Sequence, residues 1–322
     1  MPIDYGQPTA MRLIMTCPSA NDNAFQHLDM RTDNNVLGVQ VTHRGGNSGM
    51  LCLSTGHLFA RLGSTSLSGR QDMNLILVAP SDIVTSHAAP SSLSDAQPLD
   101  VRITDQRRLR HLHEVHRASV GDGFNMGVLN GDMGRGTLTA LNSTEARFEL
   151  TLDTPPPPAL PLHLILALPR PRMLARTLEN ITALGVKQVT LLNTRRVEKS
   201  YWQSPELARE KIDQHLWLGL EQTRDTCWPD IQLEPLFKPF VEDRLPALLE
   251  GKQGLIAHPH TERECPRGLS LSQPTVLAIG PEGGFIPYEV EQLTAAGLAP
   301  VHIGPRILRV ETAVVALLSR LY

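Results

Sequence analysis

The sequence has 322 residues, a formal net charge of -3 and an apolar fraction of 41%, and this length and composition predict globular cores in two domains. The negative charge excludes an attraction of the whole chain to phosphate, so any contact with nucleic acid has to come from a local basic patch. No apolar run has the length of a membrane span, and the first residues lack the pattern of a secretory signal, so we expect a cytoplasmic protein without a membrane contact.

Residues 1–72 differ in composition from the rest of the chain. They are rich in serine, glycine, asparagine and threonine, and clusters such as Asn21-Asp22-Asn23 interrupt periodic patterns. We predict that this segment is a poorly ordered extension and that the first domain begins at Met73. Scattered aspartates argue against an organelle-targeting segment.

Residues 73–154 are predicted to form a small β-rich domain. Its strand patterns are short and are separated by turn residues such as Asn130-Gly131-Asp132. A compact barrel is a common way in which many short strands protect their edges. The predicted strands are residues 75–78, 101–104, 124–129, 136–141 and 147–152.

A basic helix is predicted between the second and third of these strands, within residues 105–117. Leu109 and Leu112 fall on one helical face. The remaining faces carry four arginines, which are Arg107, Arg108, Arg110 and Arg117. This cluster is predicted either to contact RNA phosphates or to be a solvated helix face, and the sequence leaves both interpretations open.

Four consecutive prolines at positions 155–158 predict a stiff linker. Beyond it, residues 160–322 alternate between strand and helix patterns, which is typical of an α/β domain with a largely parallel sheet. The predicted strands are residues 162–168, 188–192, 231–236, 254–257, 275–279 and 301–303. The last helix has one apolar stripe that we expect to be buried, formed by Val310, Val314, Leu317, Leu318 and Leu321.

Two glycine-containing loops follow two of these strands, at residues 280–285 and 304–309. Because open α/β sheets bind ligands at the carboxyl ends of their strands, the two loops predict one ligand crevice. The chain lacks a P-loop, a dinucleotide-binding fingerprint and a Gly-x-Ser-x-Gly nucleophile elbow. Glu282 would repel phosphate, so the crevice suits an uncharged adenosine with a polar tail better than a polyphosphate.

The segments Ile279–Phe285 and Gly304–Ala313 resemble the two motifs of the RsmE family, the 16S ribosomal RNA uridine-N3 methyltransferases. Other similar segments are Arg170–Met173, Leu184–Val186, Glu221–Arg224, Arg110–Leu112 and Val120–Asp122, so that the resemblance covers residues 73–322. The resemblance implies an α/β protein in which a PUA-like β-barrel that binds RNA precedes a SPOUT methyltransferase domain. It also implies that the chain of the second domain forms a trefoil knot, an exception to the unknotted topology of most folds.

The resemblance further implies S-adenosyl-L-methionine as cofactor, 16S rRNA of the small ribosomal subunit as substrate, and a homodimer whose interface completes each active site. Arg172 and the barrel arginines are the implied RNA contacts. The implied cofactor-binding residues are His258, Ile279, Gly280, Pro281, Gly283, Gly284, Ile303, Gly304, Ile307 and Leu308. An RNA-binding or assembly factor with the same fold and a transfer RNA methyltransferase are the alternative functions, because arginines that read phosphate do not distinguish between RNAs.

The sequence departs from the family at three positions. Asn180 and Ala183 stand where the family commonly has a lysine and a glutamate. Ile286 replaces a serine or threonine, which removes an N-cap hydroxyl from the next helix and is partly offset by Pro287 at the helix start.

The N3 atom of uridine carries a proton, so a methyltransferase has to help this proton leave and align the nitrogen with the methyl group. Our hypothesis is that Arg306 and Arg309 orient the nucleotide or stabilise the uracil anion. Glu311 is the candidate general base or a carboxylate that positions an arginine, and the alternative is a first-turn carboxylate that stabilises the last helix. Glu282 is interpreted either as a carboxylate that repels phosphate from the crevice or as a partner in a salt bridge.

His258, His260 and Cys265 lie close together in the sequence and could hold zinc. No fourth ligand has a suitable spacing, and the four cysteines of the chain form no CxxC pair. We therefore predict no metal site, and we expect His258 to contact the cofactor through its backbone.

Overall fold

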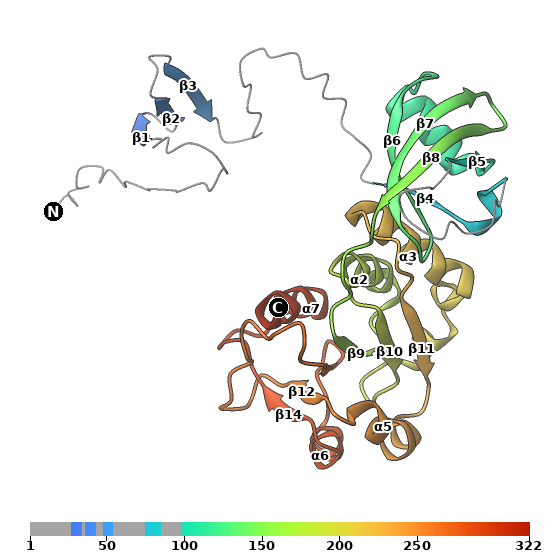
Figure 1. Cartoon of the computed structure of the whole chain (residues 1–322). Coiled ribbons are helices and arrows are strands. Elements are labelled where there is room, and N and C mark those ends of the chain that lie inside the picture. Colours follow the sequence, from blue (N-terminus) through green and yellow to red (C-terminus); the bar gives the residue numbers. More distant parts are fainter. Residues whose placement is uncertain (1–26, 34–35, 43–47, 54–74, 85–97) are drawn as a thin grey trace. The chain divides into compact units, whose positions relative to one another are not determined.

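The computed structural model describes residues 27–33, 36–42, 48–53, 75–84 and 98–322 (Figure 1). The chain divides into two compact units, residues 1–69 and 70–322. The first unit contains an antiparallel sheet in the order β1-β2-β3. These strands are β1 (His27–Asp33), β2 (Val36–Thr42) and β3 (Ser48–Leu53). The other positions of the predicted extension lie outside the described residues, so its poor order stays a prediction.

The second unit begins with a curled five-stranded sheet in the order β4-β6-β7-β8-β5 (Figure 1). β4 pairs with β6 in parallel, and the remaining pairs are antiparallel. A bridge between Ile83 and Val101 links the chain after β4 to β5, so the two edges of the sheet approach each other as the predicted barrel requires. The strands are β4 (Ile76–Val78), β5 (Leu99–Ile103), β6 (Gly123–Val128), β7 (Met133–Leu141) and β8 (Ala146–Thr154), which confirms all five predicted strands.

A helical segment between β5 and β6 closes one end of this sheet. It consists of α1 (Gln106–Arg110) and a wider π-helical continuation (His111–His116). Asp105 caps the start of α1, because its side chain accepts a hydrogen bond from the backbone N–H of Arg108. Leu109 and Leu112 are buried in the barrel core, as their helical spacing predicted.

A six-stranded sheet follows in the order β11-β10-β9-β13-β12-β14, and all of its strand pairs are parallel. β9 lies inside the sheet, and all six of its residues are buried, which fits an apolar strand covered on both faces. The strands are β9 (Leu162–Ala167), β10 (Gln188–Leu192), β11 (Asp230–Glu234), β12 (Gln253–Ala257), β13 (Thr275–Ile279) and β14 (Ala299–Val301). The predicted parallel sheet is confirmed, with strand limits shifted by one or two residues.

Helices cover both faces of the parallel sheet (Figure 1). One face packs on α2 (Pro171–Ala183), α3 (Arg209–Thr223) and α7 (Val310–Leu321). The other face packs on the segment of α4 (Phe237–Pro239), a π-helical turn (Phe240–Arg244) and α5 (Leu245–Leu249), and on α6 (Pro287–Ala295). Short 3-10 turns are formed by Pro80–Asp82, Lys199–Gln203 and Pro205–Leu207.

The apolar stripe of the last helix is buried as predicted. All five of its positions are at most 5% exposed. All five are leucines or valines that would each contribute about 1.5 to 3 kcal/mol on burial, so α7 is a structural part of the domain as well as a wall of the site described below. The knotted path of the chain stays a prediction.

Candidate active site

Three neighbouring parallel strands end at the same level of the sheet. Ala257, the last residue of β12, lies opposite Ile279 of β13 on one side and Val301 of β14 on the other. The loops that leave these strands therefore begin side by side. This is the sheet edge at which α/β proteins bind ligands.

The three loops surround a cavity of about 1030 Å³. Its lining is mostly apolar and also includes glycine backbone from both glycine loops. All ten predicted cofactor-binding residues line it, from His258 through the residues of the first loop to Leu308 of the second. The cavity therefore has the size and the wall of a small-molecule site, and the two loops contribute to one crevice as their spacing predicted.

The first glycine loop requires glycine at two of its positions, for different reasons. A Cβ atom on Gly280 would lie 2.9 Å from the backbone nitrogen of Phe285. Gly284 has a positive φ of 72° and donates its N–H to the carbonyl of Pro281 at 2.7 Å. The loop therefore exposes backbone to the cavity, and glycine is needed for this path.

The second loop depends on glycine for a different reason. Gly304 has a φ of 141°, which an L-residue rarely adopts, although no atom lies within 4 Å of the place where its Cβ would be. Its N–H donates to Nδ1 of His302 at 3.1 Å. Backbone conformation, and not lack of space, therefore selects glycine at this position.

The structure places only one of the three predicted catalytic residues on the cavity wall. Arg306 lines the cavity, whereas Arg309 and Glu311 are not among its lining residues. Arg309 is the exposed N-cap residue of α7, and Glu311 lies in the first turn of that helix. In that position a carboxylate also interacts favourably with the N-terminal end of the helix, which was the alternative interpretation of Glu311.

Glu282 fits both interpretations, as a charge on the crevice wall and as a partner in a salt bridge. It lines the cavity, and its Oε1 is 3.4 Å from Nε of Arg170, which belongs to the loop after β9. The Glu282 side chain is 32% exposed and that of Arg170 is 62% exposed, so the pair contributes little to stability. The carboxylate adds negative charge to the wall, as expected for a site that does not hold polyphosphate.

His258 enters the site directly after β12, and its backbone N–H donates to the carbonyl of Val301 at 2.9 Å. Burial, together with the nearby charge of His260, lowers the pKa of its ring. Burial raises the pKa of the Cys265 thiol, which therefore stays protonated at neutral pH. Among the residues that the structure describes, no group of three or more His, Cys, Asp or Glu side chains is arranged to hold a metal ion.

Sequence reasoning missed two residues that hold the first glycine loop in place. Arg196, in the loop after β10, lines the cavity and donates a hydrogen bond from Nη1 to the carbonyl of Gly283. Glu289 of α6 is 2% exposed, and its Oε1 accepts the backbone N–H of Arg195 at 2.6 Å. Its Oε2 accepts the N–H of Ile286 at 2.9 Å, which is the half of a capping box that does not need an N-cap hydroxyl.

A carboxylate three residues after an N-cap is a recognisable sequence signal, so the bond between Glu289 and Ile286 could have been predicted. The bond to Arg195 spans 94 positions of the sequence and has no local signal. By joining the loop after β10 to the start of α6, Glu289 holds together two segments that line the cavity.

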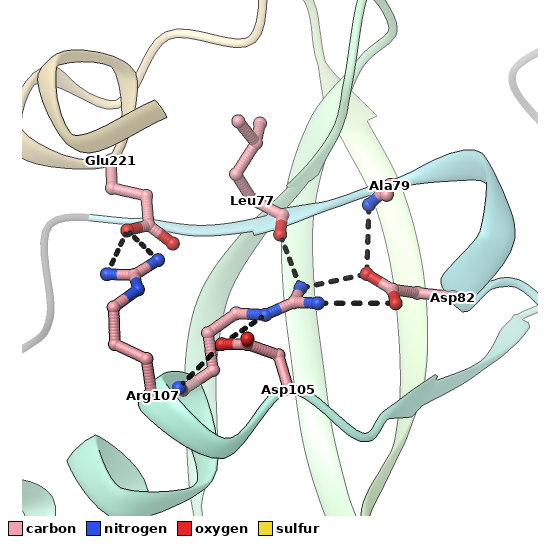
Figure 2. Close-up of polar contacts among 7 residues, drawn as sticks. Leu77, Ala79, Asp82, Asp105, Arg107 and Glu221 are labelled. Atoms are coloured by element: carbon pink, nitrogen blue, oxygen red, sulfur yellow. Dashed lines mark hydrogen bonds and ion pairs between the residues drawn. The ribbon is translucent and has the colours of Figure 1, made fainter. Parts of the chain in front are cut away.

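The arginines predicted to contact RNA differ in their surroundings. Arg110, Arg117 and Arg172 are exposed. Arg107 is within 3.3 Å of Glu221, and Arg108 is within 2.8 Å of Asp82 in a network of polar contacts (Figure 2). The Arg108 side chain is only 13% exposed, and its charge is paired with that of Asp82 within the protein. An RNA contact by the other four stays a prediction.

Comparison with known proteins agrees with this geometry. The family model of the RNA methyltransferase domain matches residues 156–322, which is more than half of the chain. A ribosomal RNA small subunit methyltransferase E of Treponema pallidum is 31% identical over 213 residues, covering 65% of this chain and 80% of the relative. The protein of the same name from Synechocystis is 28% identical and covers 76% of each chain.

A solved structure shows the same fold. The crystal structure of a ribosomal RNA small subunit methyltransferase E from Neisseria gonorrhoeae, bound to S-adenosyl methionine, superposes with a TM-score of 0.57 at 20% identity. The match covers 76% of this chain and 94% of that structure.

The parallel sheet, the cavity at its strand ends and the family match define an RNA methyltransferase domain. With its preceding curled sheet and its named relatives, the chain belongs to the ribosomal RNA small subunit methyltransferase E (RsmE) family, as the two glycine motifs predicted. None of the helices in the described part of the chain combines the length and apolar character needed to cross a membrane.

Proposed function

We propose that this chain methylates N3 of a specific uridine in 16S rRNA of the small ribosomal subunit, with S-adenosyl-L-methionine as the methyl donor. The observation that carries the proposal is the cavity itself, in which all ten predicted cofactor-binding residues come together at three adjacent strand ends. The membership in the RsmE family and the donor named for the Neisseria relative support it.

The residues of the cavity fit this donor. Ile279, Ile303 and Leu308 provide apolar surface for an adenosine, and the glycine loops provide backbone donors and acceptors for its polar groups. Glu282 and Glu291 also line the cavity, and their charges favour a sulfonium over a polyphosphate. When bound, the donor supplies an electrophilic methyl group.

The residues of the chain have to prepare the uridine. In this proposal Arg306, at the cavity wall, orients the base and stabilises the negative charge that develops on uracil as its N3 proton leaves. Arg309 and Glu311, which begin α7 beside this loop, complete the catalytic set. Glu311 would accept the proton or hold an arginine in position, and its place in the first helical turn serves helix stability in either case.

We further propose that the protein acts as a homodimer in the cytoplasm and contacts its RNA through Arg110, Arg117 and Arg172. Three large apolar side chains next to the cavity support an interface between two copies. Ile307 is 75% exposed, and Leu308 and Val315 are each 37% exposed. Exposed large apolar side chains are a common feature of association surfaces.

The test uses small ribosomal subunits from a strain that lacks the corresponding gene. Purified protein and labelled S-adenosyl-L-methionine are expected to produce one methylated uridine in 16S rRNA, which mass spectrometry locates. The Arg306→Ala variant is expected to lose at least about a hundredfold in kcat. The matched control is Arg267→Ala, which removes an exposed arginine outside the cavity lining.

Three results would contradict the proposal. A protein that does not bind the cofactor in calorimetry would be a binding or assembly factor. A methyl group that appears on transfer RNA would assign a different substrate, and full activity of Arg306→Ala would remove this residue from the catalytic set.

A further inference from the structure

The curled sheet and the parallel-sheet domain meet at a joint that takes no part in the cavity lining. We define the joint as two contacts within the compact unit of residues 70–322. In the first, α1 lies against α3 (Figure 2). In the second, the turn between β6 and β7 lies against residues 225–228.

The centre of the first contact is Arg108 of α1, whose side chain is 13% exposed. Nη1 and Nη2 of Arg108 donate to the two carboxylate oxygens of Asp82 at 2.8 and 3.3 Å. Nη1 also donates to the carbonyl of Leu77 at 3.1 Å, and Nε lies 3.5 Å from Asp105. The guanidinium is therefore fixed in one orientation by three segments of the barrel, with three of its N–H groups donating to protein acceptors.

This fixed guanidinium faces the neighbouring domain. Its central carbon lies 5.6 Å from the ring centroid of Trp217 on α3, within the range of a cation–π contact. One turn further along α3, Glu221 accepts hydrogen bonds from both terminal nitrogens of Arg107 at 3.3 Å. Two consecutive arginines of α1 thus hold the same helix of the methyltransferase domain.

The second contact is made by hydrogen bonds between backbone groups and between backbone and the Asn130 side chain. The N–H of Asn130 donates to the carbonyl of Thr226 at 2.8 Å, and the N–H of Trp228 donates to Oδ1 of Asn130 at 2.8 Å. A Cβ atom on Gly127 would lie 2.5 Å from Cγ2 of Thr226, so the two segments touch closely. Buried Leu77 and Leu220 fill the space between the two contacts, and a joint fixed at two places resists rotation about either one.

α3, the helix that holds the barrel, covers the same face of the parallel sheet as α7, which forms part of the cavity wall. α3 packs closely on α2, since a Cβ atom on Gly219 would lie 2.7 Å from Cβ of Thr182. His215 of α3 and Glu179 of α2 are 2.9 Å apart. α2 in turn shares a buried cluster with α7, whose Leu317 lines the cavity. The position of the barrel is thereby tied to the position of the cavity.

We propose that the joint sets the distance and orientation between the RNA-contacting surface of the barrel and the cavity, and that Arg108 is a positioning residue for methylation of the RNA. Arg108 acts through Trp217 and makes no RNA contact of its own. The inference rests on the proposed function, because it assigns the joint a role in that reaction.

The experiment measures kcat and KM for small ribosomal subunits and the affinity for S-adenosylhomocysteine. In Arg108→Gln, KM for the subunit is expected to rise about tenfold or more, because barrel and cavity no longer engage the RNA together, and kcat is expected to fall, because the reacting atoms are misaligned. The affinity for S-adenosylhomocysteine is expected to stay within about twofold of wild type. The control Arg102→Gln breaks the exposed 2.7 Å ion pair with Glu145 in the same barrel, away from the joint, and is expected to leave KM unchanged.

The salt dependence of RNA binding separates positioning from direct contact. Loss of one phosphate contact lowers the slope of log affinity against log salt by about 0.9, or about 0.7 for single strands. For Arg108→Gln we expect a slope equal to that of the wild type. A lower slope would make Arg108 an RNA contact, and an unchanged KM would make the joint irrelevant to the reaction; either result overturns the inference.

If Arg108→Gln does not fold, a charge reversal of the pair Arg107 and Glu221 tests the role of the joint instead. Arg107→Glu is expected to raise KM, and the double variant Arg107→Glu with Glu221→Arg is expected to restore it, because the pair is re-formed with opposite polarity. A double variant as impaired as Arg107→Glu would show that Arg107 contacts RNA and would overturn the role proposed for the joint. A wild-type protein that binds S-adenosylhomocysteine but methylates no ribosomal RNA would instead refute the proposed function.

Discussion

A buried histidine in the parallel sheet makes the stability of the protein depend on pH. His163 of β9 is 4% exposed, and its Nε2 lies 2.8 Å from the hydroxyl oxygen of Thr190 on β10. Burial, with a smaller contribution from the charge of Lys252, lowers the pKa of His163 from 6.5 to about 4. The folded protein therefore holds this ring neutral where the unfolded chain would bind a proton.

The sign and size of the effect follow from the two pKa values. The contribution is fully present above pH 6.5 and is lost as the pH falls toward 4, because the unfolded state takes up the proton first. At about 1.4 kcal/mol for each pKa unit, the full loss is about 3 kcal/mol, and about 2.5 kcal/mol of it has occurred at pH ~4.5. Other carboxylates and histidines add their own pH dependence, so only a comparison with a variant isolates this one.

The assay is urea unfolding of wild type and His163→Gln at pH 7.5 and pH 4.5. The variant is expected to be less stable at pH 7.5, since the replacement fits the core less well, but to lose about 2.5 kcal/mol less than wild type between the two pH values. His113→Gln, which removes an exposed histidine of the barrel, is expected to keep the wild-type pH dependence. Equal losses in wild type and His163→Gln would refute the assignment of a buried neutral ring.

Two further predictions concern the cavity. Gly304→Ala is expected to cost about 1 to 3 kcal/mol of strain that distorts the second loop and to weaken S-adenosylhomocysteine binding at least about tenfold in calorimetry. Gly251→Ala is the matched control, because Gly251 also has a positive φ, 69°, and open space around its Cβ position but lies outside the cavity lining; unchanged binding in both variants would show that the second loop does not hold the donor. Glu289→Gln replaces one acceptor oxygen with an NH₂ group that faces a backbone N–H, so we expect a loss of about 1 to 3 kcal/mol in unfolding free energy and weaker binding of S-adenosylhomocysteine. Glu250→Gln, at an exposed position, is its control, and a Glu289→Gln variant with wild-type binding would reduce Glu289 to a helix cap.

The parallel sheet and the cavity could be predicted because their signals are local. Each strand is a short apolar run bounded by turn residues, and each glycine loop follows its strand within three residues. β12 lies between β13 and β14 in the sheet, so the two glycine loops begin on either side of it. The local patterns implied that the two loops are neighbours but did not specify this strand order.

The polar contacts at the joint could not be predicted because their partners are far apart in the sequence. Arg108 contacts Asp82, which is 26 positions away in the sequence, and Arg107 contacts Glu221, which is 114 positions away. A cluster of arginines on a short helix has the same sequence pattern whether it faces RNA, water or a neighbouring domain. Only the tertiary structure shows that Arg108 has been withdrawn from solvent.

The three predicted catalytic residues show a related limit of sequence reasoning. Arg306, Arg309 and Glu311 lie within six positions, and sequence reasoning treated them as one catalytic group. α7 begins at Val310, so the chain turns from loop to helix in the middle of this set. Adjacent residues then leave the backbone in different directions, and only the loop residue Arg306 reaches the cavity wall.

The joint and the cavity together address how such a protein selects one nucleotide. Arginines that contact phosphates fix the register of an RNA but carry no sequence information. Methyl transfer requires the reacting atoms to be aligned within a fraction of an ångström, and a misplacement of about 1 Å can cost a hundredfold in rate. A barrel that moved freely would bind many RNAs and align none of them. In our proposal, a barrel held by Arg108, Trp217 and the Asn130 turn would present RNA at one distance from Arg306, so that specificity would arise from the rigidity of the joint as well as from the contacts.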